Sequence, residues 1–157
     1  MIRIATERDL AEICILSNEI NNAHFKNLPD DFLEPDDSQR DAPYWRKFIE
    51  GEASVVFVAE DQDKHVVGAV ATSVSSDVPV PFIISRPRCS VATIVVNQAW
   101  KSKGIGKQLM SAVEGFAKEH GATDVRLDVM AFNKEALAFY NSLGFGEFSL
   151  RLSKSIG

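Results

Sequence analysis

Two glycines lie among three lysines at the point where an apolar segment gives way to a helix-like pattern. The stretch WKSKGIGKQLM, residues 100–110, directly follows the apolar run VATIVV and three polar or small residues. Glycine leaves the backbone open to a ligand and permits loop conformations that turn successive N–H groups toward one anion. The first turn of a helix adds unpaired N–H groups and the positive end of its dipole. The stretch therefore predicts a site for a phosphate or pyrophosphate.

The glycine spacing differs from that of the best-known phosphate-binding motifs. A dinucleotide fingerprint needs a third glycine where this chain has Leu109. A Walker P-loop needs four residues between its glycines and then Gly-Lys-Ser/Thr. A lone Gly-x-Gly is equally well explained as a turn that eases a strand into a helix, so a second motif is needed.

A second motif follows about thirty residues later, in the stretch NKEALAFYNSLGF at residues 133–145. Together with VNQAWKSKGIGKQLM at residues 96–110, it resembles the GNAT superfamily of N-acetyltransferases. Those motifs read Arg/Gln-x-x-Gly-x-Gly/Ala and Asn-x-x-Ala-x-x-Phe-Tyr-x-x-x-Gly-Phe. The resemblance is strongest over residues 90–148 and only general over residues 20–50, and Lys101 departs from the first motif position.

The resemblance implies a sheet that splays between its fourth and fifth strands, with acetyl-CoA as cosubstrate in the cleft and no metal. The pantetheine arm would pair with the fourth strand, and the pyrophosphate would lie on the amides of the following loop. Asn133 and Phe139 are further implied cofactor contacts, although Asn133 is equally explained as a helix N-cap. The implied strand and loop contacts are Ile94, Val95, Val96, Lys101, Ser102, Lys103, Gly104, Ile105, Gly106 and Lys107.

The chemistry is the attack of a neutral amine on a thioester carbon, with no covalent enzyme intermediate. The carbonyl oxygen needs a hydrogen-bond donor as it gains charge, and the leaving thiolate is helped by a proton. The resemblance assigns that proton to Tyr140 as general acid. Packing of its short apolar helix is the competing role for this tyrosine.

The general base is less directly indicated by the sequence. Many family members carry a glutamate on the fourth strand, where this chain has Ala92 and Thr93. Asp128, twelve residues before Tyr140, is the candidate base, acting directly or through a water molecule. A structural ion pair is its competing role. His24 and the acids of residues 30–37 are outside candidates.

Hydrophobic periodicity predicts a mixed α/β fold in one domain, residues 1–157. The family resemblance implies a largely antiparallel sheet of six to seven strands with about four helices. A helix capped by Thr6 and Asp9 is expected to run to about Asn21 or Ala23, and another to stop at Gly51. The other helices are expected from Ile105 to Gly121 and over residues 133–144. Strands are expected at residues 1–5, 54–61, 65–74, 89–96, 124–130 and 145–153.

Composition is that of an ordinary globular protein, with 45% hydrophobic and 25% charged residues. No apolar run approaches the ~20 residues of a membrane span, and the N-terminus lacks the apolar core of a signal peptide. Cys14 and Cys89 show no metal-binding spacing, so we expect reduced thiols in a cytoplasmic protein. A net charge of −5 argues against a nucleic-acid partner.

The sequence thus predicts an N-acetyltransferase that moves the acetyl group of acetyl-CoA to a primary amine of a small molecule or peptide. A non-catalytic acyl-CoA-binding module and a nucleotide-binding domain without acyl chemistry are the alternatives. An acid-rich segment would suit a cationic acceptor, although solubility explains it equally well, and a homodimer is the family habit. That segment contains Asp30, Asp31, Glu34, Asp36, Asp37 and Asp41, with Phe25, Phe32, Tyr44 and Trp45 between them.

Overall fold

Valine-rich segments form a five-stranded sheet at the centre of the computed structural model, which describes residues 1–36 and 39–157. The strands lie in the order β1-β2-β3-β4-β5; β1 to β4 are antiparallel, and β5 is parallel to β4. Their bounds are β1 Ile2–Ile4, β2 Ser54–Glu60, β3 Val66–Ser75, β4 Arg88–Val96 and β5 Val125–Arg126.

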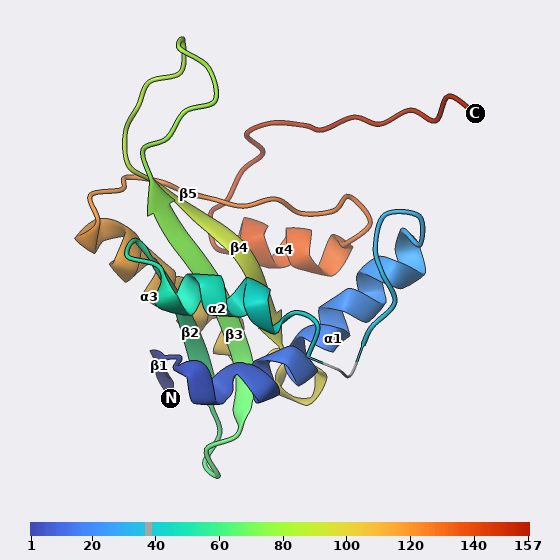
Figure 1. Cartoon of the computed structure of the whole chain (residues 1–157), viewed down its shortest axis with the longest axis vertical. Coiled ribbons are helices and arrows are strands. Elements are labelled where there is room, and N and C mark those ends of the chain that lie inside the picture. The colour runs from blue at the N-terminus through green and yellow to red at the C-terminus, as the bar shows by residue number, and fades with distance from the viewer. Residues whose placement is uncertain (37–38) are drawn as a thin grey trace.

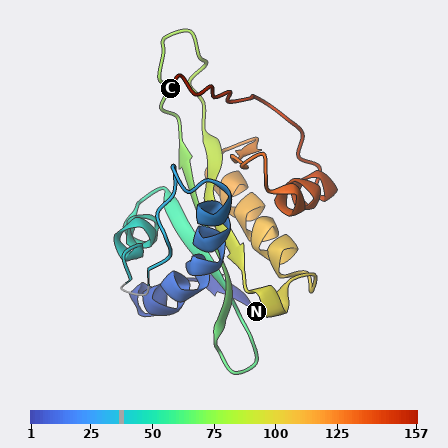
Figure 2. The same cartoon turned by 90° about the vertical axis from the view of Figure 1, so that its right-hand side faces the viewer.

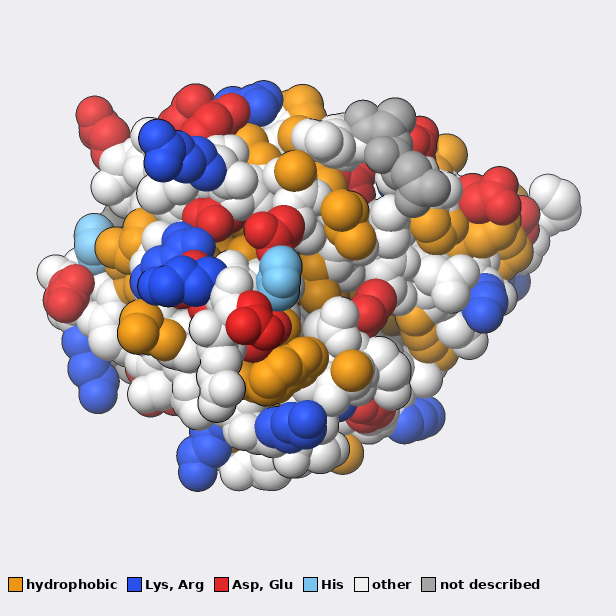
Figure 3. All heavy atoms as spheres, turned by 90° about the horizontal axis from the view of Figure 1, so that it is seen from below, with side chains coloured by type: hydrophobic (Ala, Val, Ile, Leu, Met, Phe, Trp, Pro, Cys, Tyr) orange, Lys and Arg blue, Asp and Glu red, His pale blue; other side chains and the backbone are white. Residues whose placement is uncertain are grey.

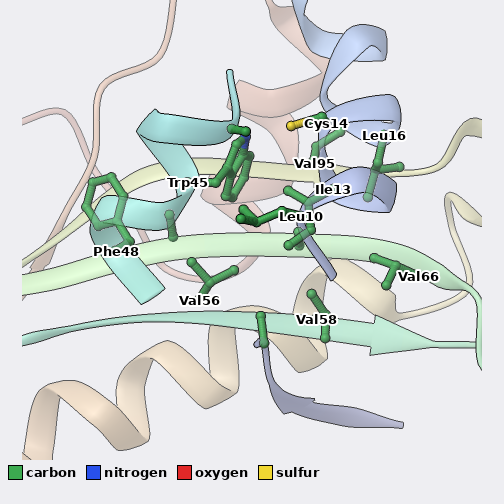
Figure 4. Packing of buried hydrophobic residues seen from close by; sticks show 14 residues of the cluster. Leu10, Ile13, Cys14, Leu16, Trp45, Phe48, Val56, Val58, Val66 and Val95 are labelled. Carbon is green, nitrogen blue, oxygen red and sulfur yellow. The ribbon is translucent and has the colours of Figure 1, made fainter. Parts of the chain in front are cut away.

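Helices cover both faces of this sheet (Figures 1 and 2). The first face carries α1 (Leu10–Asn27) and α2 (Ala42–Glu50), and the second carries α3 (Ile105–Glu119) and α4 (Lys134–Ser142). Short 3-10 turns precede α1 at Glu7–Asp9 and follow β4 at Gln98–Trp100. Each face buries its own apolar cluster, and Figure 4 shows Trp45 and Ile13 meeting above the strands.

An ion-pair network fixes the beginning of the chain to the sheet. Arg3 donates to both carboxylate oxygens of Asp9, at 2.9 and 2.8 Å, and to Glu60 at 2.7 Å. The same Asp9 carboxylate accepts the backbone N–H of Thr6 at 2.7 Å, which confirms the expected capping interaction. Hydrogen bonds from Arg3 lower the pKa of both acids.

The fourth strand has two different edges. It pairs with β3 along its whole length, from Ser75↔Arg88 to Gly68↔Val96, with a register shift that leaves Ala92 without a direct partner. On the other side, β5 pairs with it only at Cys89↔Val125 and Ser90↔Arg126. Within the described part of the chain, no strand lies against this edge beyond Ser90, so β4 and β5 diverge as the family resemblance implied.

Several sequence expectations need correction. The described residues form five strands instead of six to seven, because residues 145–153 form no strand. The strand expected at residues 124–130 is shortened to β5, since residues 127–130 continue past it without pairing. Alternation of apolar residues leads to a strand only where a neighbouring edge pairs with it, and no described strand pairs with the C-terminal segment. The first helix runs to Asn27, beyond its last regularly spaced apolar residue, and Asn21 within it donates from Nδ2 to Asp41 Oδ2 at 2.7 Å.

Charges of both signs are interspersed on the lower face of the molecule (Figure 3). That face shows no broad field of one sign that would attract a polyanion. Among the residues that the structure describes, no helix is long and apolar enough to cross a membrane.

Candidate active site

The loop between β4 and α3 is shaped by unusual backbone conformations. Ser102 and Gly104 have positive φ angles of 61° and 85°, and Gly104 is the N-cap of α3. The turn before the loop is held by Asn97, whose side chain accepts the N–H of Ala99 at 2.9 Å. Glu19 of α1 accepts the N–H of Gln98 at 3.0 Å, a long-range contact that no sequence motif indicates.

This loop presents a run of unpaired backbone donors. The first helical hydrogen bond of α3 joins the N–H of Gln108 to the carbonyl of Gly104 at 3.0 Å. Within residues 1–36 and 39–157, the backbone N–H groups of residues 102–107 make no hydrogen bond. A Cβ placed on Gly104 would meet no atom within 4 Å, so open space lies beside these donors. Unpaired N–H groups at a helix N-terminus favour an anion, and the anion site expected from the sequence stays a prediction.

The three lysines around the loop have different surroundings. Lys101 forms an ion pair with Glu135 of α4 at 3.4 Å, and the Lys103 ammonium lies 4.7 Å from the centre of the Trp100 ring. Lys107 is exposed and lines a hollow of about 320 Å³ between α3 and the end of α4. Lys107 is therefore the loop lysine beside an open space.

The second glycine has a structural task. A Cβ on Gly106 would lie 2.9 Å from Cζ of Phe139, closer than real Cβ contacts. Gly106 thus lets α4 pack against the first turn of α3. The two sequence motifs meet at this contact, so the loop and the helix that carries Tyr140 position one another.

The free edge of β4 leads from the strand pairing to the loop. Ile94 and Val96 pack with Phe139 into the α3–α4 cluster, while Val95 points to the opposite cluster. The backbone at Ile94, Val95 and Val96 pairs with β3 on one side and with no described strand on the other. An extended ligand therefore has an unpaired edge to follow toward the unpaired N–H groups.

Tyr140 is buried, with 9% of its surface exposed, and packs against Phe139 and Phe145 at ring-centre distances of 5.2 and 5.6 Å. Burial raises the pKa of Tyr140 to about 12, so the phenol stays protonated at neutral pH. Its hydroxyl has no hydrogen-bond partner among the described residues. The one fully buried unpaired side-chain polar atom there is Arg88 Nε, so the Tyr140 hydroxyl reaches the surface. Packing and proton donation are compatible in this arrangement.

The candidate bases lie apart from one another. Asp128 is exposed just beyond β5 and makes no hydrogen bond or ion pair within the described residues. Thr93, on the strand where many family members carry a glutamate, shares a 2.6 Å hydrogen bond with the Tyr44 hydroxyl. Burial raises the pKa of Tyr44. No described contact joins Asp128 to Tyr140.

An aromatic cluster connects α1 and the acid-rich segment to the residues that precede α4. His24 of α1 stacks on Phe32 at 4.5 Å and meets the edge of Phe132 at 5.7 Å. Burial lowers the pKa of His24, which favours a neutral imidazole. Phe132 precedes Asn133, whose side chain accepts the N–H of Ala136 at 3.1 Å and so caps α4. The sequence showed these rings but not their contact.

The acid-rich segment is only partly a free acidic surface. Asp41 accepts hydrogen bonds from Asn21 at 2.7 Å and from Arg40 at 3.0 Å, while Asp30, Asp31 and Glu34 are exposed. Trp45 is only 1% exposed, so it belongs to the core and cannot line a surface that binds the acceptor. Asp37 lies outside the described residues.

Comparison with known proteins agrees with this geometry. Residues 19–145 match the family described as "Acetyltransferase (GNAT) family". N-acetyltransferase 8 of Homo sapiens is 30% identical over 100 residues, or 64% of this chain and 42% of that protein. Streptothricin acetyltransferase of Streptomyces lavendulae is 33% identical over 92 residues, or 59% of this chain and 44% of that protein. The chain therefore spans less than half the length of these curated relatives.

Solved structures extend the likeness to the whole chain. A mutant of the BH1408 protein from Bacillus halodurans superposes with a TM-score of 0.93 at 25% identity, over 99% of both chains. AAC(6')-Iy, in a complex with a bisubstrate analogue of CoA and acetylneamine, has a TM-score of 0.74 at 21% identity, over 99% of this chain and 96% of its own. With the family match over most of its length and this fold, the chain belongs to the GNAT family of acetyltransferases.

Proposed function

We propose that this protein transfers the acetyl group of acetyl-CoA to a primary amine of a cationic small molecule by direct attack within a ternary complex. The observation that carries the proposal is that an unpaired strand edge runs directly into a loop of unpaired backbone N–H groups. The free β4 edge at residues 91–96 leads into the unpaired N–H groups of residues 102–107. This combination fits an extended pantetheine arm that ends in a pyrophosphate.

Acetyl-CoA would supply the activated acetyl group, and the chain supplies its binding surface. Backbone amides and the N-terminus of α3 provide positive potential for the pyrophosphate without relying on any one lysine. Lys107 adds a charge beside the adjoining hollow. The side-chain NH₂ of Asn133 remains available to a ligand, because its Oδ1 atom caps the helix.

Tyr140 is proposed as the general acid for the thiolate. Its raised pKa keeps the proton on the oxygen until a strongly basic group is formed nearby, and its hydroxyl has no competing acceptor among the described residues. Asp128 is proposed as the base that removes the amine proton through water. An exposed carboxylate has enough solvent around it for such a relay.

A cationic small amine is the proposed acceptor class. The streptothricin acetyltransferase relative is named for a small-molecule substrate, and Asp30, Asp31 and Glu34 are exposed on the connection between α1 and α2. Opposite charge draws such a substrate to this side of the cleft. A peptide amine is the main competing acceptor.

The test mixes the protein and acetyl-CoA with a panel of cationic antibiotics, polyamines and peptides, and follows the release of free CoA thiol. Amine-dependent thiol release with an acetylated product is expected, and it should be faster for the small cations than for the peptides. If acetyl-CoA bound tightly in calorimetry while no amine released thiol, the protein would be an acyl-CoA-binding module. The absence of an acid at Ala92 and Thr93 is the observation that favours this second candidate.

A further inference from the structure

A pair of hydroxyl groups joins α2 to the fourth strand, on the side of the sheet that carries α1 and α2. The Tyr44 hydroxyl and the Thr93 Oγ1 atom lie 2.6 Å apart, and either oxygen can be the donor. Thr93 is half-buried, and Tyr44 is 38% exposed although its side chain is large and partly apolar. The pair therefore lies at the surface, where water or a ligand can reach its oxygen atoms.

An irregularity in β4 turns Thr93 toward this side of the sheet. Val91 packs into the cluster under α3 and α4, and regular alternation would give Thr93 the same direction. The register shift leaves Ala92 as an extra residue. Thr93 consequently faces α2, while the next residue, Ile94, packs under α3 and α4. A bulge of this kind re-aims a side chain, and here it places a hydroxyl on the same side of the sheet as the α1–α2 connection.

The helix α2 is held on the sheet without this hydrogen bond. Trp45 and Phe48 reach from α2 into the core, with only 1% and 8% of their surfaces exposed (Figure 4). Their rings also meet the Tyr44 ring edge-on, at centre distances of 5.7 and 5.4 Å, which fixes the direction of the phenol. An exposed hydroxyl pair adds little stability, because water replaces either partner when the bond is broken. The packing thus presents two positioned oxygens that contribute little to the fold.

Two neutral oxygens suit an amine that must react as a nucleophile. One hydrogen lies between the oxygens of the pair, so oxygen lone pairs remain to accept N–H groups. An amine that is held by its N–H groups keeps the nitrogen lone pair free for attack. Neutral oxygens also add no negative charge that would favour the unreactive ammonium form.

Two charged groups of α2 lie near the pair. The Lys47 ammonium lies 5.4 Å from the centre of the Tyr44 ring, and a neighbouring cation favours the neutral form of an amine bound beside it. Burial and then the charge of Asp41 raise the pKa of Tyr44, so the phenol stays neutral. The Asp41 carboxylate is already engaged by hydrogen bonds from Asn21 and Arg40.

We propose that the Tyr44 and Thr93 hydroxyls together hold the acceptor amine at the free edge of β4, where many family members carry a glutamate. This role rests on the proposed acetyl transfer and adds the residues that position its nucleophile. The acyl donor would follow the unpaired edge of the same strand, so the amine and the thioester meet across one strand. Asp128 remains the proposed base, and the hydroxyl pair is assigned positioning only.

The first test measures amine binding without turnover. Spermidine and streptothricin are titrated by calorimetry into the protein saturated with free CoA, which cannot donate an acetyl group. Tyr44→Phe and Thr93→Val each remove one hydroxyl and keep the shape of the side chain, and each should weaken probe binding roughly tenfold. Thr93→Ser should restore binding. Ser90→Ala, which removes an exposed hydroxyl from the same strand, should leave binding unchanged.

The double variant Tyr44→Phe/Thr93→Val tests whether the two hydroxyls act as one pair. Its loss of affinity should be much smaller than the product of the two single losses, because either single variant already breaks the pair. Unchanged affinity in both single variants, or failure of both probes to bind the CoA-loaded wild type, overturns the proposal. A parallel loss of CoA affinity and of unfolding free energy in urea also overturns it, because the hydrogen bond would then be purely structural.

Thiol release separates this role from the proposed function. With acetyl-CoA in place of CoA, both single variants should raise the KM of the amine while the KM of acetyl-CoA stays nearly unchanged. If the probes bind as expected and no thiol is released, acetyl transfer fails as the proposed function and the amine site stands. If wild type and variants release thiol with equal kcat and equal KM for the amine, acetyl transfer stands and the hydroxyl pair has no part in holding the amine.

Discussion

Replacing Gly106 by alanine adds one methyl group where the ring of Phe139 already lies. The added Cβ would sit 2.9 Å from Cζ and 3.3 Å from Cε1 of that ring. Overpacking of this kind costs about 1–3 kcal/mol, and the better helix propensity of alanine offsets up to ~1 kcal/mol. A net destabilisation of about 1 kcal/mol follows, which corresponds to a fall of about 2–4 °C in Tm for a chain of this size.

The matched control lies in the same helix. Gly115 has no atom within 4 Å of its added Cβ, so Gly115→Ala should stabilise the fold by up to ~1 kcal/mol. The second control removes the ring: in a Phe139→Leu background, Gly106→Ala should cost little or become stabilising. Urea unfolding of the four proteins in the Gly106–Phe139 cycle gives the coupling energy, which we expect at about 1–2 kcal/mol.

Acetyl-CoA affinity, measured by calorimetry on the same proteins, separates packing from ligand contact. If Gly106 acts through its contact with Phe139 of α4, Gly106→Ala lowers affinity in the wild type but has little effect on affinity in the Phe139→Leu background. The reasoning is refuted if Gly106→Ala is as stabilising as Gly115→Ala, or if Phe139→Leu leaves its cost unchanged.

Four further outcomes follow from the site and the sheet. Gly104→Ala should cost about 1 kcal/mol from its positive φ of 85°, without a clash, and should weaken acetyl-CoA in calorimetry; unchanged stability and affinity would contradict the proposed loop. Tyr140→Phe should lower kcat by roughly 10²–10⁴-fold with affinity nearly kept. In the wild type, Tyr140 should cause a loss of folding stability between about pH 10 and 12, because the unfolded tyrosine releases its proton near pH 10 and the folded one only at about 12. Tyr140→Phe should remove this loss, and a dependence of unfolding free energy on alkaline pH identical to that of the wild type would refute the reasoning. Asp128→Asn should reduce kcat/KM most at low pH, where little free amine exists, and a loss equal at all pH values would instead indicate a structural role. Arg3→Met should lower the free energy of unfolding at pH 7. The difference from the wild type should shrink as pH falls below about 4, since the lowered pKa of Asp9 contributes stability only while the unfolded carboxylate is ionised. Urea unfolding at pH 7 and 3 checks this.

The sequence predicted those parts of the fold whose signals are local. Glycines 51, 104 and 121 and the capping pair Thr6 and Asp9 mark helix ends through backbone conformation or short-range hydrogen bonds, and the structure has helix boundaries at or near each. The hairpin of β2 and β3 follows from valine-rich runs around a polar turn. The loop at the start of α3 was expected only once a second motif supported the family resemblance, and anion binding there stays a prediction.

Features that depend on distant partners could not be predicted in this way. The need for glycine at 106 arises from Phe139, which lies on another helix, and the Tyr44–Thr93 hydrogen bond joins α2 to β4. The strand expected at residues 145–153 failed for the same reason. Its alternation is real, but pairing requires an edge, and the sequence does not say whose edge that is.

The narrow junction between β4 and β5 has a consequence for motion as well as for binding. Only two residue pairs join the strands there, so the segment from β5 through α4 is held to the rest mainly by side-chain packing. Such a segment opens locally at a lower free energy than the four antiparallel strands. A ligand that contacts both β4 and β5 would stabilise the closed state, because its contacts are lost when the segment from β5 through α4 opens. Without acetyl-CoA, the amide hydrogens of α4 would therefore exchange faster than those of β2 and β3, and ligand binding would slow this exchange.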